Sequence, residues 1–168
     1  MKPIIHVALA IIAIFSSVTA FATTSGKTGG DLVIQSDKLN LNQNTKDSYF
    51  TGRVVVTQDD LLINSDDLLA HQDEAGEKHI TLKGNPVTFK QLDQDGKWVN
   101  GQADIIVYDT KTKIMILTNH AKVTKDGDLV IGQQIKYNTV TKVYDVTSLN
   151  NSSRVTVILQ DRNNSDKK

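Results

Sequence analysis

The chain contains no cysteine among its 168 residues, and this absence removes a whole group of functions. Without thiols there are no disulfides, zinc–thiolate sites, thiol nucleophiles or lipid-modified N-terminal cysteine. An excess of charge of one sign is also missing, because 19 Lys and Arg balance 19 Asp and Glu. This balance argues against nucleic-acid binding, which normally needs a basic face, and against a polybasic membrane anchor.

The first 22 residues have the composition of a targeting segment. A positive start at Lys2 precedes an apolar run over residues 4–18, and Ala20 and Ala22 then stand two apart. This pattern predicts a cleavable secretory signal over residues 1–22, the alternative being a retained membrane anchor. Cleavage would change the net charge to −1, since Lys2 is the only charged residue of the segment.

Residues that favour helices are scarce after the predicted signal. Four alanines and two glutamates remain, against 17 aspartates, whereas Val, Ile and Thr are abundant. Ala and Glu favour helices, Asp favours turns, and β-branched residues favour strands. The composition therefore predicts an all-β domain over residues 31–160, with polar, disordered tails at residues 23–30 and 161–168.

Polar clusters rich in Asp, Asn and Gly divide this domain into short apolar runs. Asp95-Gly96 and Asp126-Gly127 are the strongest hairpin signals, because Gly accepts a positive φ and Asp forms local backbone bonds. No stretch shows a convincing helical period, so no long helix is expected. We predict turns at residues 42–45, 58–60, 73–76, 93–96, 109–111, 125–128 and 138–139.

Two patterns recur along the domain. In the first pattern, a small residue is followed by a polar residue and then by apolar ones. Its four copies begin at Ser36, Ser65, Ala103 and Gly132. The second contains Gly or Asn, which bend a strand cheaply, and occupies residues 50–54, 82–86 and 117–121. The patterns predict about four repeated units with roughly a dozen to sixteen short strands. A β-sandwich without true repeats is the alternative.

Apolar side chains alternate with polar ones along the predicted strands, so that each strand has one apolar face and one wet face. Stacked repeats would line up the apolar faces into one continuous interior, either an open trough or a closed core. The residues expected to line a trough are Leu32, Ile34, Phe50, Val54, Val56, Leu61, Ile63, Val87, Phe89, Ile106, Tyr108, Leu117, Val123, Ile135 and Tyr137.

The first and last predicted strands lack the residues that usually protect a sheet edge. Residues 31–35 and 155–160 contain neither Pro nor Lys. Such edges can pair with strands of a partner, unless the polar tails cover them. The expected partner edges are Leu32, Val33, Ile34 and Gln35 at one end and Val155, Thr156, Val157 and Ile158 at the other.

Motifs for catalysis, cofactors and metals are weak. The domain has three histidines, His71, His79 and His120, and none belongs to an HExxH or i, i+4 pair. There is no nucleophile elbow, P-loop or dinucleotide fingerprint. Residues 93–96 loosely resemble a calcium loop but lack its Glu and have Gly at the wrong position, which favours a hairpin turn. We therefore predict no enzyme activity, no cofactor and no metal site.

Several motifs together resemble the LptA/OstA-like family of periplasmic lipopolysaccharide-transport proteins, over residues 32–159. The most specific is the run F-T-G-R-V-V-V-T-Q at residues 50–58, followed by I-N-S-D at residues 63–66. Further matches are I-Q-S-D at 34–37, G-N-P-V-T-F at 84–89 and R-V-T-V at 154–157. The third and fourth repeats match more loosely, because Asn119 and Gln133 stand where the family often has Gly and Asp.

The resemblance implies an open, V-shaped antiparallel β-jellyroll that holds lipopolysaccharide acyl chains in an apolar trough. It also implies head-to-tail self-assembly through sheet edges, forming a periplasmic bridge. The implied partners are an inner-membrane-anchored component of the same fold and an outer-membrane β-barrel translocon. None of the trough residues has a catalytic role in such a carrier.

Two other functions remain open at this level. One is a structural periplasmic adaptor with a closed core and no lipid cargo. The other is an outer-membrane barrel, which would need aromatic girdles, whereas only seven aromatic residues follow the predicted signal.

Overall fold

A computed structural model describes residues 31–93, 95–148 and 154–160, which contain β-strands and no helix. The all-β prediction is therefore confirmed for this part of the chain, where no helix that could cross a membrane is found. The strands are β1 (Val33–Gln35), β2 (Lys38–Asn42), β3 (Asp47–Gln58), β4 (Leu61–Gln72), β5 (Lys78–Leu92), β6 (Trp98–Asp109), β7 (Ile114–Lys125), β8 (Asp128–Asn138), β9 (Tyr144–Thr147) and β10 (Thr156–Ile158). The predicted signal and both tails lie outside the described residues.

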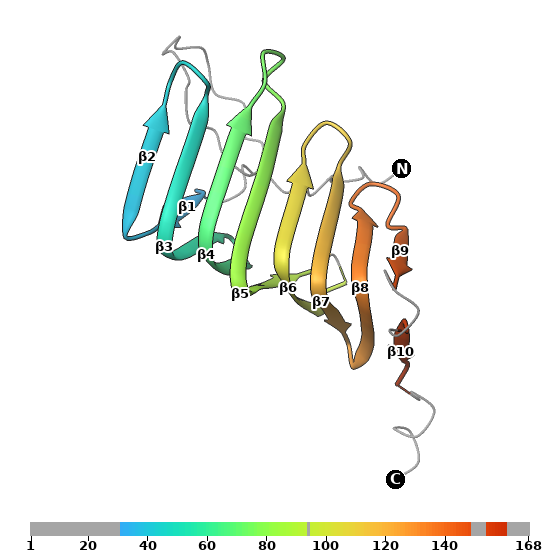
Figure 1. Ribbon diagram of the computed structural model, residues 1–168. Coiled ribbons are helices and arrows are strands. Elements are labelled where there is room, and N and C mark those ends of the chain that lie inside the picture. Colours follow the sequence, from blue (N-terminus) through green and yellow to red (C-terminus); the bar gives the residue numbers. More distant parts are fainter. Residues whose placement is uncertain (1–30, 94, 149–153, 161–168) are drawn as a thin grey trace, which may run out of the picture.

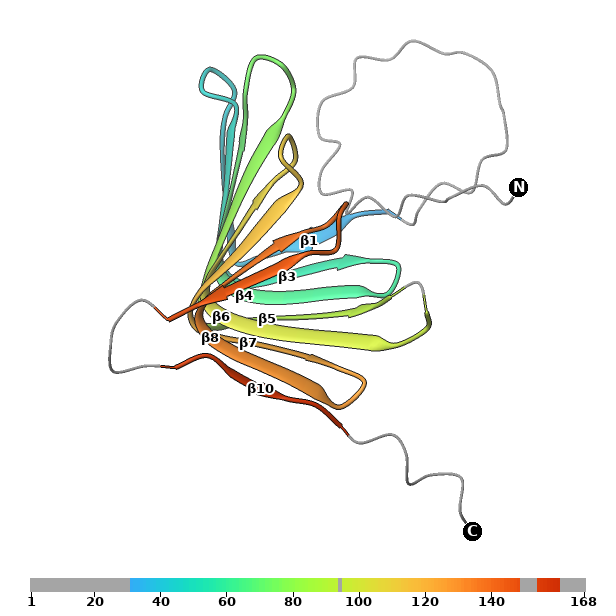
Figure 2. The same ribbon diagram turned by 90° about the vertical axis from the view of Figure 1, so that its right-hand side faces the viewer.

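The strands form one antiparallel sheet in the order β1-β3-β4-β5-β6-β7-β8-β10. Strand β2 also pairs with β3 and β9 also pairs with β8, each on the half that its neighbour β1 or β10 leaves free. The sheet is folded along a line across its middle, so that two arms diverge from a common bend (Figures 1 and 2). We call them the β2–β9 arm and the β1–β10 arm, after their outermost strands.

The bend is made by a β-bulge in each pair of neighbouring long strands. The register shifts between Thr51 and Val54 in the first pair, and four further shifts follow at the same level of the sheet. Both sequence patterns fall on this line. Gly52 and Asn119 of the second pattern have φ values of 77° and 63°, which confirms its prediction as a corner.

The prediction of many short strands is wrong in one respect. Strands β3 to β8 are each 11 to 15 residues long, because the backbone pairing continues through the bend on both sides of each bulge. Each long strand therefore contributes one half to each arm, and only the four edge strands are short.

The predicted hairpin turns are confirmed. Asp126 and Gly127 join β7 to β8 with φ values of 52° and 87°, and two positive φ values are the mark of a type I′ turn. Asp93, in the proposed calcium-like segment, accepts backbone hydrogen bonds at 2.9 Å from the N–H groups of Asp95 and Lys97. That carboxylate therefore closes a hairpin turn.

Candidate functional site: the inner face of the V

The inner face of the β2–β9 arm carries an unbroken row of apolar side chains. Each residue of the row is the direct cross-strand partner of the next, so the row crosses the arm from edge to edge. Directly opposed side chains on one face contact each other and stabilise the sheet. The row consists of Leu39, Phe50, Leu68, Leu82, Ile106, Leu117, Ile135 and Val146.

The β1–β10 arm carries a matching row on its own inner face, again in direct register across the arm. The space above the one glycine of this row is filled by a neighbouring side chain, because a Cβ at Gly101 would lie 2.1 Å from the Phe89 ring. The ring therefore occupies the space that a side chain would need. The row consists of Ile34, Val56, Ile63, Phe89, Gly101, Val123, Val130 and Val157.

Small buried residues line the bend between the two rows. Ser65 on β4, Ala103 on β6, Ala121 on β7 and Gly132 on β8 are all buried there. Their size lets the two arms meet closely. The Ser65 hydroxyl is buried with no hydrogen-bond partner among the described residues. An unpaired buried hydroxyl lowers the stability of the fold.

Side chains from both arms pack into one hydrophobic cluster. Ile80, Leu68 and Ile135 on one arm and Val54, Val56 and Val87 on the other are at most 1% exposed. A single sheet layer cannot bury side chains to this degree, so the arms cover each other near the bend. The middle of the interior is filled by side chains.

The structure brings the predicted trough residues together. Eleven of the fifteen belong to the buried cluster, and Leu32, Ile34 and Phe89 pack against it as half-buried residues. Tyr137 stands nearer the tip of the β2–β9 arm, where its ring stacks on Tyr144 at 4.3 Å between centroids. Whether these residues contact lipid stays a prediction.

Several inner-face residues were not predicted. Ile80 and Leu82 alternate along β5 and a stricter use of alternation would have found them. Leu68 and Leu69 are adjacent, and only the register shows that Leu68 is buried and Leu69 exposed. Leu39 alternates with polar residues along β2 (K-L-N-L-N), so the same rule would have found it, whereas Val146 lies on a strand of only four residues.

The apolar interior is exposed at both ends of the molecule. At the β1/β2 end, Leu39 and Leu41 are 48% and 47% exposed although both face inward. At the β9/β10 end, inward-facing Tyr144 and Val157 are 47% and 53% exposed. The two rows therefore end in uncovered apolar side chains.

The edges of the sheet are more numerous than predicted. Strands β1 and β10 do end the main strand order, but β2 and β9 form two further edges on the other arm. Leu32 and Val155, which were predicted within the edge strands, lie just outside β1 and β10. Each end of the molecule thus offers a pair of edge strands, one per arm.

Polar pairs hold the bend on its exposed side. Arg53 donates from Nε to Asp37 at 3.0 Å, and this hydrogen bond lowers the pKa of the Asp37 carboxyl below its ordinary value. Further along the bend, Nδ1 of His120 lies 2.9 Å from Asp104. These pairs join neighbouring strands where the bulges interrupt the regular ladder.

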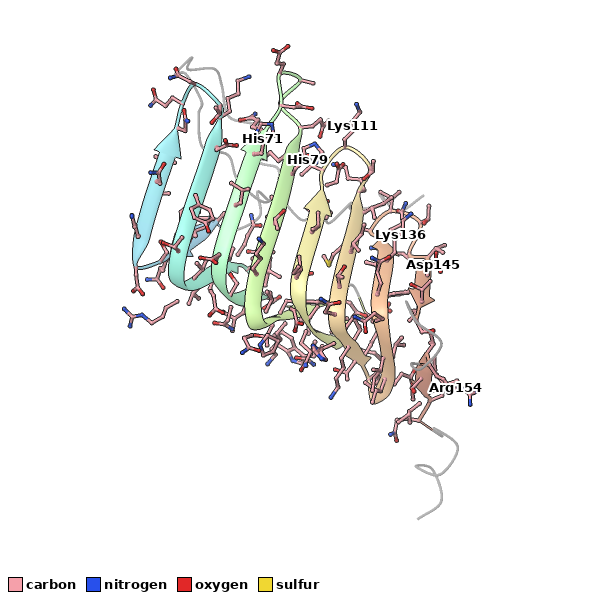
Figure 3. The ribbon with its side chains drawn as sticks, in the orientation of Figure 1. His71, His79, Lys111, Lys136, Asp145 and Arg154 are labelled. Atoms are coloured by element: carbon pink, nitrogen blue, oxygen red, sulfur yellow. The ribbon has the colours of Figure 1, made fainter. Side chains whose placement is uncertain are left out.

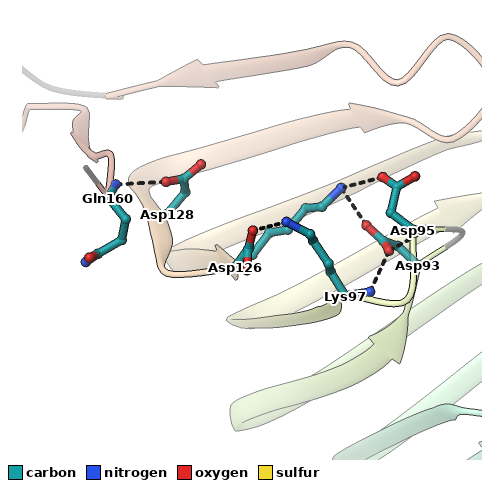
Figure 4. A network of polar contacts seen from close by, with 7 residues as sticks. Asp93, Asp95, Lys97, Asp126, Asp128 and Gln160 are labelled. Atoms are coloured by element: carbon teal, nitrogen blue, oxygen red, sulfur yellow. Dashed lines mark hydrogen bonds and ion pairs between the residues drawn. The ribbon is translucent and has the colours of Figure 1, made fainter. Parts of the chain in front are cut away.

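A second polar network ties the hairpins at the tip of the β1–β10 arm (Figure 4). Nζ of Lys125 lies 2.5 Å from Asp93 and 3.7 Å from Asp95, and Lys97 pairs with Asp126. The hydrogen bond from Lys125, and after it the one from the backbone N–H of Lys97, lowers the pKa of the Asp93 carboxyl. All these charges lie at the tip, away from the apolar rows.

The tyrosine hydroxyls on the inner face are neutral at physiological pH. Burial raises the pKa of the Tyr108 and Tyr137 hydroxyls above their ordinary value. A hollow of about 310 Å³ with polar walls, including Asn64, Lys90 and Lys122, lies instead on the outer face of the β1–β10 arm. The described residues contain no group of three or more metal-binding side chains.

These features define a class of protein: an open antiparallel β-jellyroll, folded into a V, whose inner face is a continuous apolar surface. The family model described as "LptA/(LptD N-terminal domain) LPS transport protein" matches residues 33–143. The chain therefore belongs to this family, and the resemblance inferred from its motifs is confirmed.

Curated relatives agree with the assignment. The chain is 31% identical over 167 residues to the lipopolysaccharide export system protein LptA of Escherichia coli (strain K12), covering 95% of this chain and 89% of the relative. It is 32% identical over 129 residues to the protein of the same name from Haemophilus influenzae, covering 75% and 74% of the two chains.

A solved structure has the same fold. The crystal structure of LptH, described as the LptA-homologous periplasmic component of the lipopolysaccharide transport device from Pseudomonas aeruginosa, aligns with a TM-score of 0.70. The match covers 79% of this chain and 96% of that one, at 23% sequence identity. The V-shaped jellyroll expected from the sequence is thus a fold already observed in a related protein.

Proposed function

We propose that this protein carries lipopolysaccharide across the periplasm, with the acyl chains of the lipid held between the two apolar rows. Its family and the names of its relatives support a role in lipopolysaccharide export. The predicted secretory signal and the periplasmic description of the fold relative LptH support the location. No step of this function needs a catalytic residue.

The observation that carries the proposal is the continuity of the rows from edge to edge. Burying a methylene group is worth about 0.8 kcal/mol, so an acyl chain gains affinity wherever apolar side chains line its path. A row of similar contacts on every strand offers similar sites along the whole length of the molecule. A lipid can therefore move along the inner face without passing a polar barrier.

The filled interior sets a condition on binding. Because side chains of the two arms cover each other near the bend, acyl chains must replace those contacts, either by parting the arms or by entering at the exposed ends. The exposed residues Leu39 and Val157 mark the two points of entry. Replacement of one apolar contact by another costs little, which suits a ligand that must also leave.

A photo-crosslinking experiment tests the cargo. A benzophenone amino acid at Phe89 should form an adduct with lipopolysaccharide, since this side chain belongs to the inner row of the β1–β10 arm. The same amino acid at Lys122, on the outer face of that arm, is the matched control and should form none. Equal labelling at both positions, or none at Phe89, would refute the proposed site.

We further propose that copies join end to end through the edge strands, and that the same edges meet an inner-membrane-anchored component of similar fold and an outer-membrane β-barrel translocon. The uncovered apolar ends support this, because a second copy placed edge to edge would continue both rows and bury those side chains. Four edge strands, whose outer sides pair with no other described strand, provide the pairing.

Proline at an edge tests the joint. Val157→Pro fixes φ and removes one backbone N–H, so end-to-end assembly should weaken while the melting curve of the isolated chain changes little. Val157→Ile keeps both the N–H and an apolar β-branched side chain, and its assembly should stay close to that of wild type. Assembly is measured by light scattering against concentration. Undiminished assembly of the proline variant would place the joint elsewhere.

A structural adaptor without lipid cargo is the second candidate, and the filled interior favours it. It differs from the carrier in one measurable outcome. An adaptor would assemble through its edges but would give no lipopolysaccharide adduct at Phe89.

A further inference from the structure

Four polar side chains form a row across the outer face of the β2–β9 arm, near its tip. Asp47, His71, His79 and Asp109 stand on four successive strands, and each is the direct cross-strand partner of the next. Their neighbours Ala70, Ile80 and Tyr108 are buried, so the row itself points outward. Figure 3 shows His71 and His79 side by side on adjacent strands.

Each histidine is bound to the aspartate on its far side. Nδ1 of His71 lies 2.7 Å from Asp47 Oδ1, and Nδ1 of His79 lies 2.8 Å from Asp109 Oδ2. In an imidazole ring the edge opposite Nδ1 carries Nε2. Since the two Nδ1 atoms face away from each other, both Nε2 edges face the gap between the histidines.

The aspartates are themselves held in place. The Thr45 hydroxyl donates to Asp47 Oδ2 at 2.6 Å, and the backbone N–H of Thr112 donates to Asp109 Oδ1 at 2.7 Å. Each carboxylate thus has one oxygen fixed by a turn and the other bound to a histidine. A carboxylate that accepts from Nδ1 selects the tautomer with a free lone pair on Nε2, as it does behind histidines that bind metals.

The spacing of the rings suits a shared ion. Their centroids are 6.4 Å apart and their planes differ by 26°, so the rings lie nearly parallel and too far apart for face-to-face contact. Bonds from zinc to imidazole nitrogen are about 2.0–2.1 Å long. A shared ion therefore requires side-chain rotations that bring both Nε2 atoms within this distance of it.

We propose that His71 and His79 form a surface site for a transition-metal ion, zinc or copper, with Nε2 of each ring as ligand and Asp47 and Asp109 as the groups that orient them. Imidazole is a preferred ligand of both metals. Water completes the coordination, because the protein supplies two ligands. A bound ion would link β4 to β5 at the tip of the β2–β9 arm.

The third histidine provides a matched control. His120 also hydrogen-bonds an aspartate through Nδ1, at 2.9 Å from Asp104, but it lies at the bend with no second histidine as its cross-strand partner. It therefore reproduces one half of the site.

The test is calorimetric titration of zinc chloride into the untagged protein. Wild type should bind one zinc ion per chain, His71→Gln and His79→Gln should each weaken binding at least tenfold, and His120→Gln should leave it unchanged. Asp47→Asn should weaken binding by roughly 10- to 100-fold, as loss of an orienting partner does. With copper, the electron paramagnetic resonance spectrum should show two equivalent nitrogens in wild type and one in either variant.

Clear outcomes overturn the proposal. If wild type binds no zinc, or if His71→Gln and His79→Gln bind it as tightly as wild type, the pair is not a metal site. Circular dichroism melting curves establish that each variant is folded, which is expected because both histidines are nearly half exposed.

Discussion

The two arms of the V are alike on the inside and different on the outside. Inside, each presents one apolar row that crosses every strand in register. Outside, the β2–β9 arm carries Leu69 and the Asp–His–His–Asp row, whereas the β1–β10 arm carries a polar hollow between Lys90 and Lys122. The tips differ too, with histidine–aspartate pairs on one arm and lysine–aspartate pairs on the other.

This difference shows where the fold is constrained. The inner rows must match each other because they pack into one cluster, and any mismatch would leave a cavity or a clash. Among the described residues nothing packs on either outer face, so the side chains there are free to serve other contacts. The comparison predicts that substitutions on the inner face change stability strongly and those on the outer face change it little.

The largest expected effect comes from two adjacent leucines of β4. Leu68 is 1% exposed on the inner face and Leu69 is 37% exposed on the outer face. Leu68→Ala should lower the free energy of unfolding by about 2–5 kcal/mol, through lost burial and a cavity. Leu69→Ala should change it by about 0.5 kcal/mol. Urea unfolding measures both, and equal effects would contradict the assignment of the faces.

A smaller effect distinguishes the two inner rows. Only the β1–β10 row contains a glycine, and a Cβ at Gly101 would collide with Phe89. Gly101→Ala should lower the free energy of unfolding by about 1–3 kcal/mol because the ring must move. The same change in a Phe89→Leu background should cost less, and a double-mutant cycle gives the coupling. Additive effects would mean that the ring does not fill this gap.

The tip of the β1–β10 arm should respond to acid. Because contacts with Lys125 and backbone N–H groups lower the folded-state pKa of Asp93, its stabilising effect is complete above the unfolded pKa of about 3.9. That effect disappears as pH falls through the lowered folded value. The melting temperatures of wild type and Asp93→Asn should therefore differ at neutral pH and converge in acid. A constant difference from pH 7 to pH 2 would show that the charge of Asp93 is not involved.

Most of the fold could be predicted from local chemistry. Asp-Gly turns, β-branched runs and the Gly or Asn corners located the hairpins and the bend, because each depends on a few adjacent residues. Strand lengths were harder to predict. A bulge interrupts the apolar–polar alternation and so resembles the end of a strand, although the hydrogen-bonded pairing continues on both sides of it. The bulge also shifts the alternation: on β4, Leu61 and Ile63 face inward before the bend and Leu68 and Ala70 after it.

The site was predicted only in part for the same reason. Alternation identified which side chains of one strand share a face, so Val54 and Val56 were found together. It could not show which residues of different strands stand opposite each other. Leu39 and Val146, at the two ends of one row, have no sequence signal that connects them.

The sequence by itself determined an all-β chain, its turns, its bend and the apolar character of one face, because these follow from backbone preferences and from the twofold period of a strand. The tertiary structure alone decided how the strands align. Register across the sheet joined scattered residues into two facing rows, and it placed Leu39 and Val146 at the two ends of one row although most of the domain separates them in sequence. Alignment depends on the length of every turn and bulge at once, and no single stretch of sequence contains that information.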